Sequence, residues 1–127
     1  LKATGISAEV FYAEIMWGNV MKAVRKNIVL YHEISRYPAV SRDLALLVDK
    51  SVEFAAIEAI AAQTEKKLLK SVELFDVYEG NLPEGKKSYA VNFILQDESK
   101  TLNDKQIENV MNRLITNLKT KLGAELR

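Results

Sequence analysis

The sequence predicts an α+β fold of the ferredoxin-like, split βαβ type: a four-stranded antiparallel sheet with two helices on one face. Two observations predict it. First, apolar residues alternate along several stretches of strand length and recur at helical spacing along two longer stretches. Second, these predicted elements follow one another as strand, helix, strand, strand, helix, strand. Right-handed crossovers put both helices on one face and leave the other face open. The expected spatial order is last, first, third, second strand.

Composition narrows the possible functions. The 127 residues, 48% hydrophobic and 28% charged, suit one modest domain with an extra piece. The sequence contains no cysteine, which excludes disulfides and thiolate metal sites and suits a cytoplasmic protein. Its single histidine, His32, is interpreted as a surface residue. No apolar run approaches the ~20 residues that span a membrane, so we expect no membrane partner.

Net charge limits any role with nucleic acid. The 18 basic and 17 acidic residues leave a formal charge of +1. A protein that binds nucleic acid mainly through phosphates is usually far more basic. Nucleic-acid binding here would therefore depend on a local patch, on base contacts or on other parts of a larger protein.

Residues 1–36 are predicted to be an extension with one strand and one short helix. Glu9–Trp17 alternates like a strand, Gly18-Asn19 breaks it, and Val20–Val24 has helical spacing over little more than one turn. Such a piece cannot close a core alone. We interpret it as the tail of a preceding domain plus a linker, with the domain of residues 37–127 beginning at Tyr37-Pro38. The chain begins without methionine, so we expect a fragment.

The first strand and helix of the predicted domain follow the linker. Val40–Asp49 has apolar residues on both faces, which favours an interior strand. Ser51 is the expected N-cap of a helix from Val52 to about Glu65, which Lys66 and Lys67 would close favourably for its dipole. The apolar stripe of this helix consists of Phe54, Ile57, Ile60 and Ala61.

A hairpin with a long loop comes next. Leu68–Tyr78 and Lys86–Gln96 alternate as strands, and residues 79–85 between them contain two glycines and a proline. We predict that Phe75 and Phe93 point into the core beneath the helices. The helix-facing set is Phe75, Val77, Tyr89, Val91 and Phe93.

The second helix has the clearest start in the chain. Asn103 as N-cap and Gln106 three residues later predict a capping box, and Leu102 with Ile107 a hydrophobic staple. Gly123 is expected to end the helix, and residues 124–127 to add a short last strand. The apolar stripe runs through Ile107, Val110, Met111, Leu114, Leu118 and Leu122.

The open face is the candidate functional surface. Small residues near its middle, an aromatic residue and polar groups around them are typical of sheets that stack and recognise unpaired bases. Lys86 and Lys87 beside the loop could meet phosphates. By period two, the face is expected to carry Asp43, Ala45, Leu47, Leu74, Asp76, Tyr78, Ser88, Ala90, Asn92 and Ile94.

Other interpretations of the same residues stay open. Such a face can be simply solvated or covered by another domain. Tyr78 could be a half-buried packing residue, and the two lysines a solvated loop end. Asp43 with Asp76 is a weak candidate for an acid–base or metal pair, because no third ligand accompanies them. The sequence contains no glycine-rich phosphate loop and no nucleophile motif.

Four motifs in order resemble the C-terminal ferredoxin-fold anticodon-binding (FDX-ACB) domain of bacterial phenylalanyl-tRNA synthetase beta subunits. They are Ser41–Ala45 (SRDLA), Phe75–Gly80 (FDVYEG), Gly85–Ser88 (GKKS) and Thr101–Asp104 (TLND). The resemblance covers about residues 37–127, and Leu122–Arg127 (LGAELR) is similar to the natural C-terminus of such a subunit.

The resemblance implies a domain that recognises the anticodon of tRNA(Phe) and does no chemistry itself. It implies a parent enzyme that uses ATP and magnesium to join phenylalanine to tRNA, as an alpha2-beta2 heterotetramer whose alpha subunit is catalytic. The residues that it places against bases are Asp43, Ala45, Tyr78, Ser88 and Ala90. Together with Asp76, Asn92, Lys86 and Lys87 from the open-face assignment, they are the predicted RNA-binding residues. The alternative is a regulatory or protein-interaction module of the same fold that binds no RNA; a deep pocket between strand ends would favour it.

Overall fold

The chain forms two separate compact units. The computed structural model describes residues 5, 8–25, 27–31 and 33–127, so His32 lies outside the described residues. Contacts divide the chain into residues 1–33 and 34–127, and each unit is considered by itself. The boundary predicted after residue 36 stays a prediction.

The first unit differs from the sequence prediction. Its described residues include one helix, α1 (Trp17–Val24), and Glu9–Met16 forms no strand. A strand needs a partner to bond its backbone, and this short piece offers none among its described residues. The expected break at Gly18-Asn19 is also wrong, because the Asn19 amide donates to the Met16 carbonyl at 2.8 Å and closes the first helical turn.

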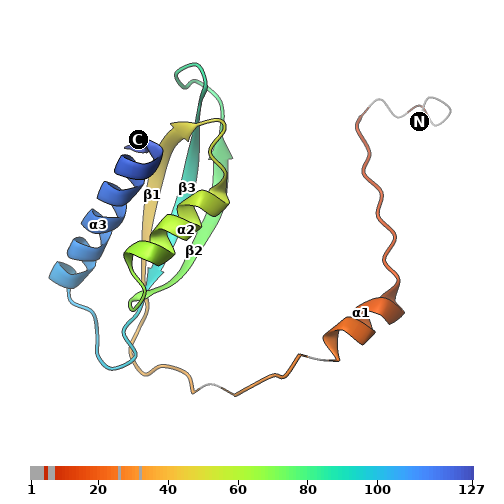
Figure 1. Cartoon of the computed structure of the whole chain (residues 1–127), viewed down its shortest axis with the longest axis horizontal. Helices are drawn as coiled ribbons and strands as arrows, with labels where there is room; N and C mark the ends of the chain where they lie inside the picture. The colour runs from red at the N-terminus through yellow and green to blue at the C-terminus, as the bar shows by residue number, and fades with distance from the viewer. Residues whose placement is uncertain (1–4, 6–7, 26, 32) are drawn as a thin grey trace. The chain divides into compact units, whose positions relative to one another are not determined.

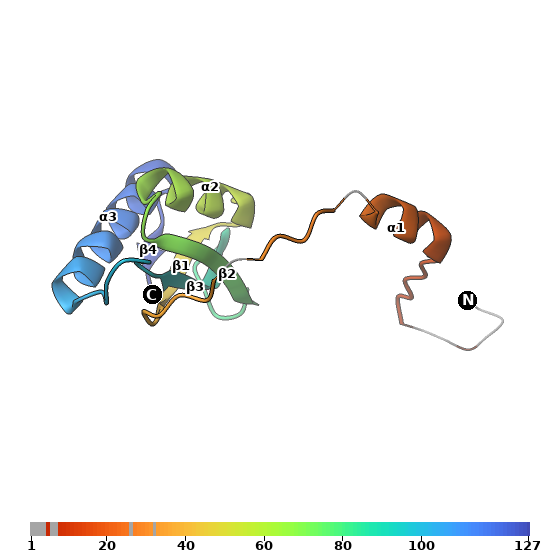
Figure 2. The ribbon, with the colours of Figure 1, turned by 90° about the horizontal axis from the view of Figure 1, so that it is seen from below.

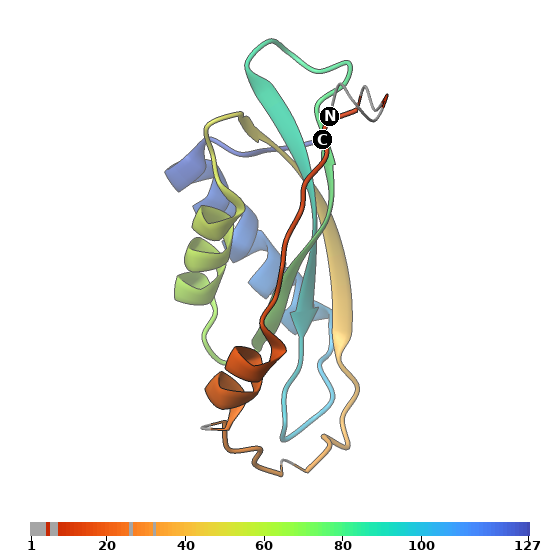
Figure 3. The same ribbon diagram turned by 90° about the vertical axis from the view of Figure 1, so that its right-hand side faces the viewer.

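The second unit has the predicted topology (Figures 1 and 3). Four antiparallel strands form one sheet in the order β2-β3-β1-β4, and α2 and α3 lie on the same side of it (Figure 2). Between these layers lies the core. The elements are β1 (Val40–Asp49), α2 (Phe54–Thr64), β2 (Leu69–Tyr78), β3 (Lys86–Leu95), α3 (Asp104–Leu122) and β4 (Glu125–Leu126).

Strands β1 and β3 confirm the predicted central part of the sheet. They pair along their whole length, from Val40 with Leu95 to Asp49 with Lys86. β1 is interior as expected, although β4 pairs only with Leu46 and Leu47 on its other side. The residues that these two strands bury under the helices are Leu46, Val48, Tyr89, Val91, Phe93 and Leu95.

Helix α2 begins later than predicted. Its N-cap is Glu53, with no side-chain cap, so the expected cap at Ser51 is wrong. The reason is a turn that the Val52 amide closes onto the Asp49 carbonyl at 3.0 Å, which delays the helix. The C-cap is Glu65, and Lys66 and Lys67 lie beyond it. Glu65 instead accepts hydrogen bonds from the Lys67 and Leu68 amides and from Arg113 of α3.

Helix α3 begins and ends as predicted. Asn103 and Gln106 form both hydrogen bonds of the capping box. Leu102 and Ile107, the expected staple, are both buried. Gly123 ends the helix in the left-handed conformation (φ 61°), which suits glycine. No described helix has both the length and the apolar character that crossing a membrane requires.

Strand β2 contains two irregularities, and the second corrects the prediction. Its register against β3 shifts between Leu69 and Ser71 and again between Leu74 and Asp76. Leu74 therefore pairs with core-facing Val91 and packs against the core rather than lying on the open face. Phe75 is the extra residue and is 61% exposed, so its predicted place in the core is wrong.

Past the bulge, the predicted faces hold again. Asp76 pairs with Ala90 and Tyr78 with Ser88, both on the open face, while Val77 pairs with core-facing Tyr89. Val77 nevertheless remains 44% exposed, because it lies near the end of the edge strand.

Candidate nucleic-acid interface

The open face consists of three rows of side chains across β1, β3 and β2. Directly paired residues share a face, so the registers assign each row. The first row has polar groups, the second has two alanines, and the third has the aromatic residue. The rows are Asp43–Asn92–Glu73, Ala45–Ala90–Asp76 and Leu47–Ser88–Tyr78.

A hydrogen-bonded cluster fixes the first row. The Asn92 amide nitrogen donates to Asp43 Oδ1 at 2.5 Å and also to the Ser41 hydroxyl. The amide oxygen of Asn92 and the second carboxylate oxygen of Asp43 therefore remain as acceptors. In the next row, Asp76 Oδ1 accepts from the Val77 amide at 2.9 Å. This part of the face is suited to groups that donate hydrogen bonds, such as base N–H groups.

Tyr78 is held in place by the loop that follows it. The Asn81 amide donates to Tyr78 Oη at 3.2 Å. A Cβ on Gly80 would overlap Oη and Cζ of Tyr78 and would lie 2.9 Å from Cε2, so the Gly80 backbone lies against the end of the ring. Glycine is therefore required for this close approach. The Arg127 guanidinium carbon lies 4.7 Å from the ring centroid.

The two predicted phosphate-binding lysines point to opposite faces. Lys86 pairs with Asp49 on the open face, and its ammonium lies 2.8 Å from the Asp49 carboxylate. This hydrogen bond to Asp49 raises the pKa of Lys86 above its usual value. Lys87 pairs with core-facing Val48, and its ammonium lies 4.7 Å from the Tyr89 ring centroid. All the predicted contact residues except Lys87 thus share the open face.

Sequence reasoning missed two residues. Phe75 is a second exposed aromatic residue, next to Asp76 in the chain, and Arg127, directly after β4, lies over Tyr78 on the open face. The three-residue spacing of Leu69 and Val72 is a sign of the first irregularity in β2, and the two consecutive apolar residues Leu74 and Phe75 mark the second. No local pattern indicates the contact of Arg127, because its partner lies on another strand.

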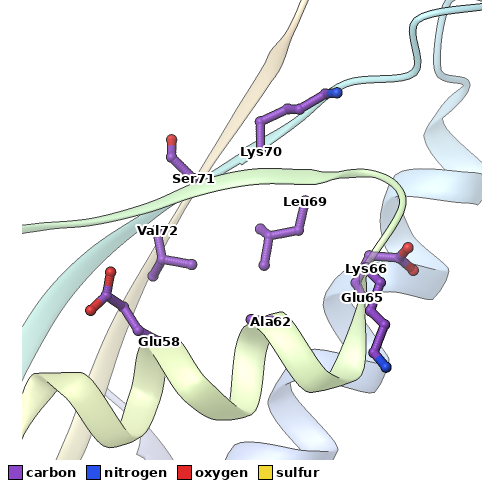
Figure 4. A pocket seen from close by; sticks show the side chains of 8 residues that line it. All are labelled: Glu58, Ala62, Glu65, Lys66, Leu69, Lys70, Ser71 and Val72. Carbon is purple, nitrogen blue, oxygen red and sulfur yellow. The ribbon is translucent and has the colours of Figure 1, made fainter. Parts of the chain in front are cut away.

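A pocket on the helix side offers no competing site. Figure 4 shows Leu69 and Val72 pointing from β2 toward Ala62 of α2, with Ser71 on the opposite side of the strand. Two of its charged lining residues are already paired, Glu65 with Arg113 and Lys70 with Glu98. Within the described part of the chain, no group of three histidine or acidic residues could hold a metal ion.

Comparisons with known proteins identify the family of the second unit. The sequence model of a family described as "Ferredoxin-fold anticodon binding domain" matches residues 35–127. Proteins named phenylalanine–tRNA ligase beta subunit are 63% identical in Bacteroides fragilis, 62% in Bacteroides thetaiotaomicron and 53% in Porphyromonas gingivalis. Each match covers 100% of this chain but 16% of the relative. The chain therefore spans about a sixth of the length of these relatives.

Proposed function

Because the chain belongs to the family of ferredoxin-fold anticodon binding domains, we propose that its open face binds the anticodon of a phenylalanine tRNA. The observation that carries this proposal is the combination of an anchored tyrosine, Tyr78, with a floor of small residues, Ala45 and Ala90, in the neighbouring row. A flat base can lie over such a floor and stack on the ring.

Base recognition would come from the acceptors around that floor. Asp43, Asp76 and the Asn92 oxygen can accept hydrogen bonds from base N–H groups. Ser88 can both donate and accept. The small net charge of the chain fits a surface that contacts bases more than phosphates, while other parts of a larger protein supply phosphate contacts.

We further propose that the chain is part of a beta subunit that supports attachment of phenylalanine to tRNA. In that protein, ATP, magnesium and the chemistry would belong to a catalytic alpha subunit in an alpha2-beta2 assembly. The role of this domain would be recognition alone. A regulatory or protein-interaction module is the other class of function, and it predicts no dependence on the anticodon.

The first test is binding of a phenylalanine-tRNA anticodon stem-loop to this chain. Base–aromatic stacking is worth about 1–3 kcal/mol, so Tyr78→Ala should weaken binding roughly tenfold to a hundredfold. Tyr12→Ala removes a tyrosine that is 85% exposed in the other unit and should leave binding unchanged. Equal affinity for a stem-loop with an altered anticodon would contradict anticodon recognition, and full binding by folded Tyr78→Ala would contradict stacking on this ring. Absence of binding to either stem-loop would favour the module that binds no RNA.

The second test moves the ring without removing it. A Cβ at Gly80 cannot coexist with the present position of Tyr78, so Gly80→Ala should displace the ring and weaken binding of the stem-loop. Asn81→Ala is the matched control, because the hydrogen bond to Tyr78 comes from the Asn81 backbone amide, which this substitution keeps. In the parent enzyme, both Tyr78→Ala and Gly80→Ala should lower tRNA charging and leave amino-acid activation unchanged.

A further inference from the structure

Arg127 extends over the open face from the opposite edge of the sheet. Its backbone amide donates to the Ala45 carbonyl at 3.0 Å, which anchors it beside β1. Its guanidinium nevertheless lies over the ring of Tyr78, which belongs to β2. Because β1 and β3 lie between these anchors, the two side chains meet above the middle of the sheet.

The contact covers the centre of the face that we propose to bind a base. Ser88 lies between Leu47 and Tyr78 in its row and is only 4% exposed, although it belongs to the open face. Ala45 and Ala90 in the neighbouring row leave room for the long side chain to pass. A base stacked on Tyr78 over this floor would need the space that the arginine now takes.

Of the two partners, Arg127 is the one that can leave. Tyr78 is held by the Asn81 amide and by the close approach of Gly80. The Arg127 side chain pairs with no carboxylate among the described residues of the second unit. An exposed cation–π contact is also weaker than base–aromatic stacking, so a base can replace the guanidinium on the ring.

We propose that Arg127 is an exchangeable strap: it covers Tyr78 in the free domain and transfers its guanidinium to an RNA phosphate when a base stacks there. This inference rests on the proposed function. A guanidinium without a carboxylate partner, released next to a bound nucleotide, is well suited to pair with its phosphate. Arg127 is thus a binding residue that also keeps the face covered before RNA arrives.

The first experiment follows the Arg127 side chain by NMR. In the free chain its δ-methylene protons should be shifted upfield by the Tyr78 ring, and Tyr78→Leu should remove that shift. Saturation with the anticodon stem-loop should remove it in the unmodified chain as well, because the guanidinium leaves the ring. An upfield shift that persists at saturation, or one that is absent from the free chain, would overturn the proposal.

The second experiment measures stem-loop affinity as a function of salt. Arg127→Ala and Arg127→Gln should weaken binding roughly threefold to tenfold at low salt, and lower the slope of log K against log salt by about 0.7, the value for one phosphate contact on a single strand. Arg127→Lys should restore most of the slope. Arg25→Ala, at the exposed C-cap of α1, is the matched control and should change neither quantity.

The outcomes separate the two proposals. If Tyr78→Ala weakens binding but Arg127→Ala leaves affinity and slope unchanged, the strap is wrong and the open face still binds RNA. If Arg127→Ala binds the stem-loop more tightly and the salt dependence of binding is unchanged, Arg127 only blocks the ring and contacts no phosphate. That result also overturns the proposed transfer of its guanidinium to the RNA. If Tyr78→Ala has no effect, the proposed function itself fails.

Discussion

Strands β2 and β3 are the two arms of one hairpin, yet they obey the period of two very differently. Along β3, Tyr89, Val91, Phe93 and Leu95 are buried without interruption. Along β2, the register against β3 shifts twice, and the exposed Phe75 falls between core-facing Leu74 and open-face Asp76. Alternation in the sequence therefore assigns the faces of one arm and fails in the other.

The difference follows from the place of each strand in the sheet. β3 pairs with β2 on one side and β1 on the other, so an extra residue would disrupt two ladders. β2 is an edge strand with a single partner and can accommodate a bulge. Bulges also make an edge a poorer template for pairing with another chain.

The second bulge has a consequence for the open face. With Val72 and Leu74 in the core, uninterrupted alternation would turn Asp76 and Tyr78 toward the helices as well. The extra residue reverses the parity and brings both onto the open face, opposite Ala90 and Ser88. The predicted faces of Asp76 and Tyr78 are correct because they follow from Val77, which lies after the bulge. The prediction is wrong for Phe75, which is the extra residue, and for Leu74, which lies before it.

Deleting one residue from each arm should produce the largest contrast. Deletion of Asn92 from β3 should abolish cooperative unfolding, because it turns one half of the buried residues of this strand to the wrong face. Deletion of Phe75 removes the unpaired residue and leaves Leu74 and Asp76 on their present faces, so the protein should still fold. Circular dichroism during heating measures both. An equal loss of cooperative unfolding in the two deletion variants would contradict the bulge at Phe75.

The two phenylalanines give a smaller contrast of the same kind. Phe93 is fully buried, and Phe93→Ala should lower the free energy of unfolding by about 3–5 kcal/mol. Phe75 is 61% exposed, and Phe75→Ala should cost less than about 1 kcal/mol. Denaturant titrations of the two variants, measured side by side, provide the comparison. Similar losses would mean that Phe75 packs into the core after all.

The smallest expected effect concerns the turn that follows β3. Asp97 accepts hydrogen bonds from the Ser99 hydroxyl at 2.6 Å and the Ser99 amide at 2.9 Å, which lower the pKa of this carboxyl below its usual 3.8. Its contribution to stability is therefore present above pH 3.8 and is lost as the pH falls through the lowered pKa. In Asp97→Asn this loss should be absent, so the stabilities of the two proteins should converge in acid.

Ser99→Ala checks the cause of that pH dependence. It removes the hydroxyl that contributes most to the lowered pKa of Asp97, while the backbone amide stays in place. Denaturation midpoints between about pH 2 and 6 should then show a smaller acid loss than in the unmodified protein. If Ser99→Ala loses as much stability in acid as the unmodified protein, the acid loss originates in a group other than Asp97.

The sequence alone determined the features whose interactions are local or strictly periodic. The capping box of Asn103 and Gln106 lies within one helical turn, and Gly123 needs its positive φ wherever the helix is packed. Unbroken alternation assigned the faces of β1 and β3, and the order of elements with right-handed crossovers led to the strand order. Three of the four motifs that resemble the family lie in β1, at the start of β3 and at the start of α3, and β1 and β3 also carry most of the predicted open face.

Tertiary structure decided the features that depend on a distant partner. The bulge at Phe75 exists because β2 must keep both Val72 and Tyr78 in register with β3, which local propensity does not encode. The stretch before α1 lacks a partner strand among the described residues, so its alternating pattern forms no strand. Arg127 lies over Tyr78 because the sheet brings two edge strands, far apart in sequence, within reach across a floor of small side chains.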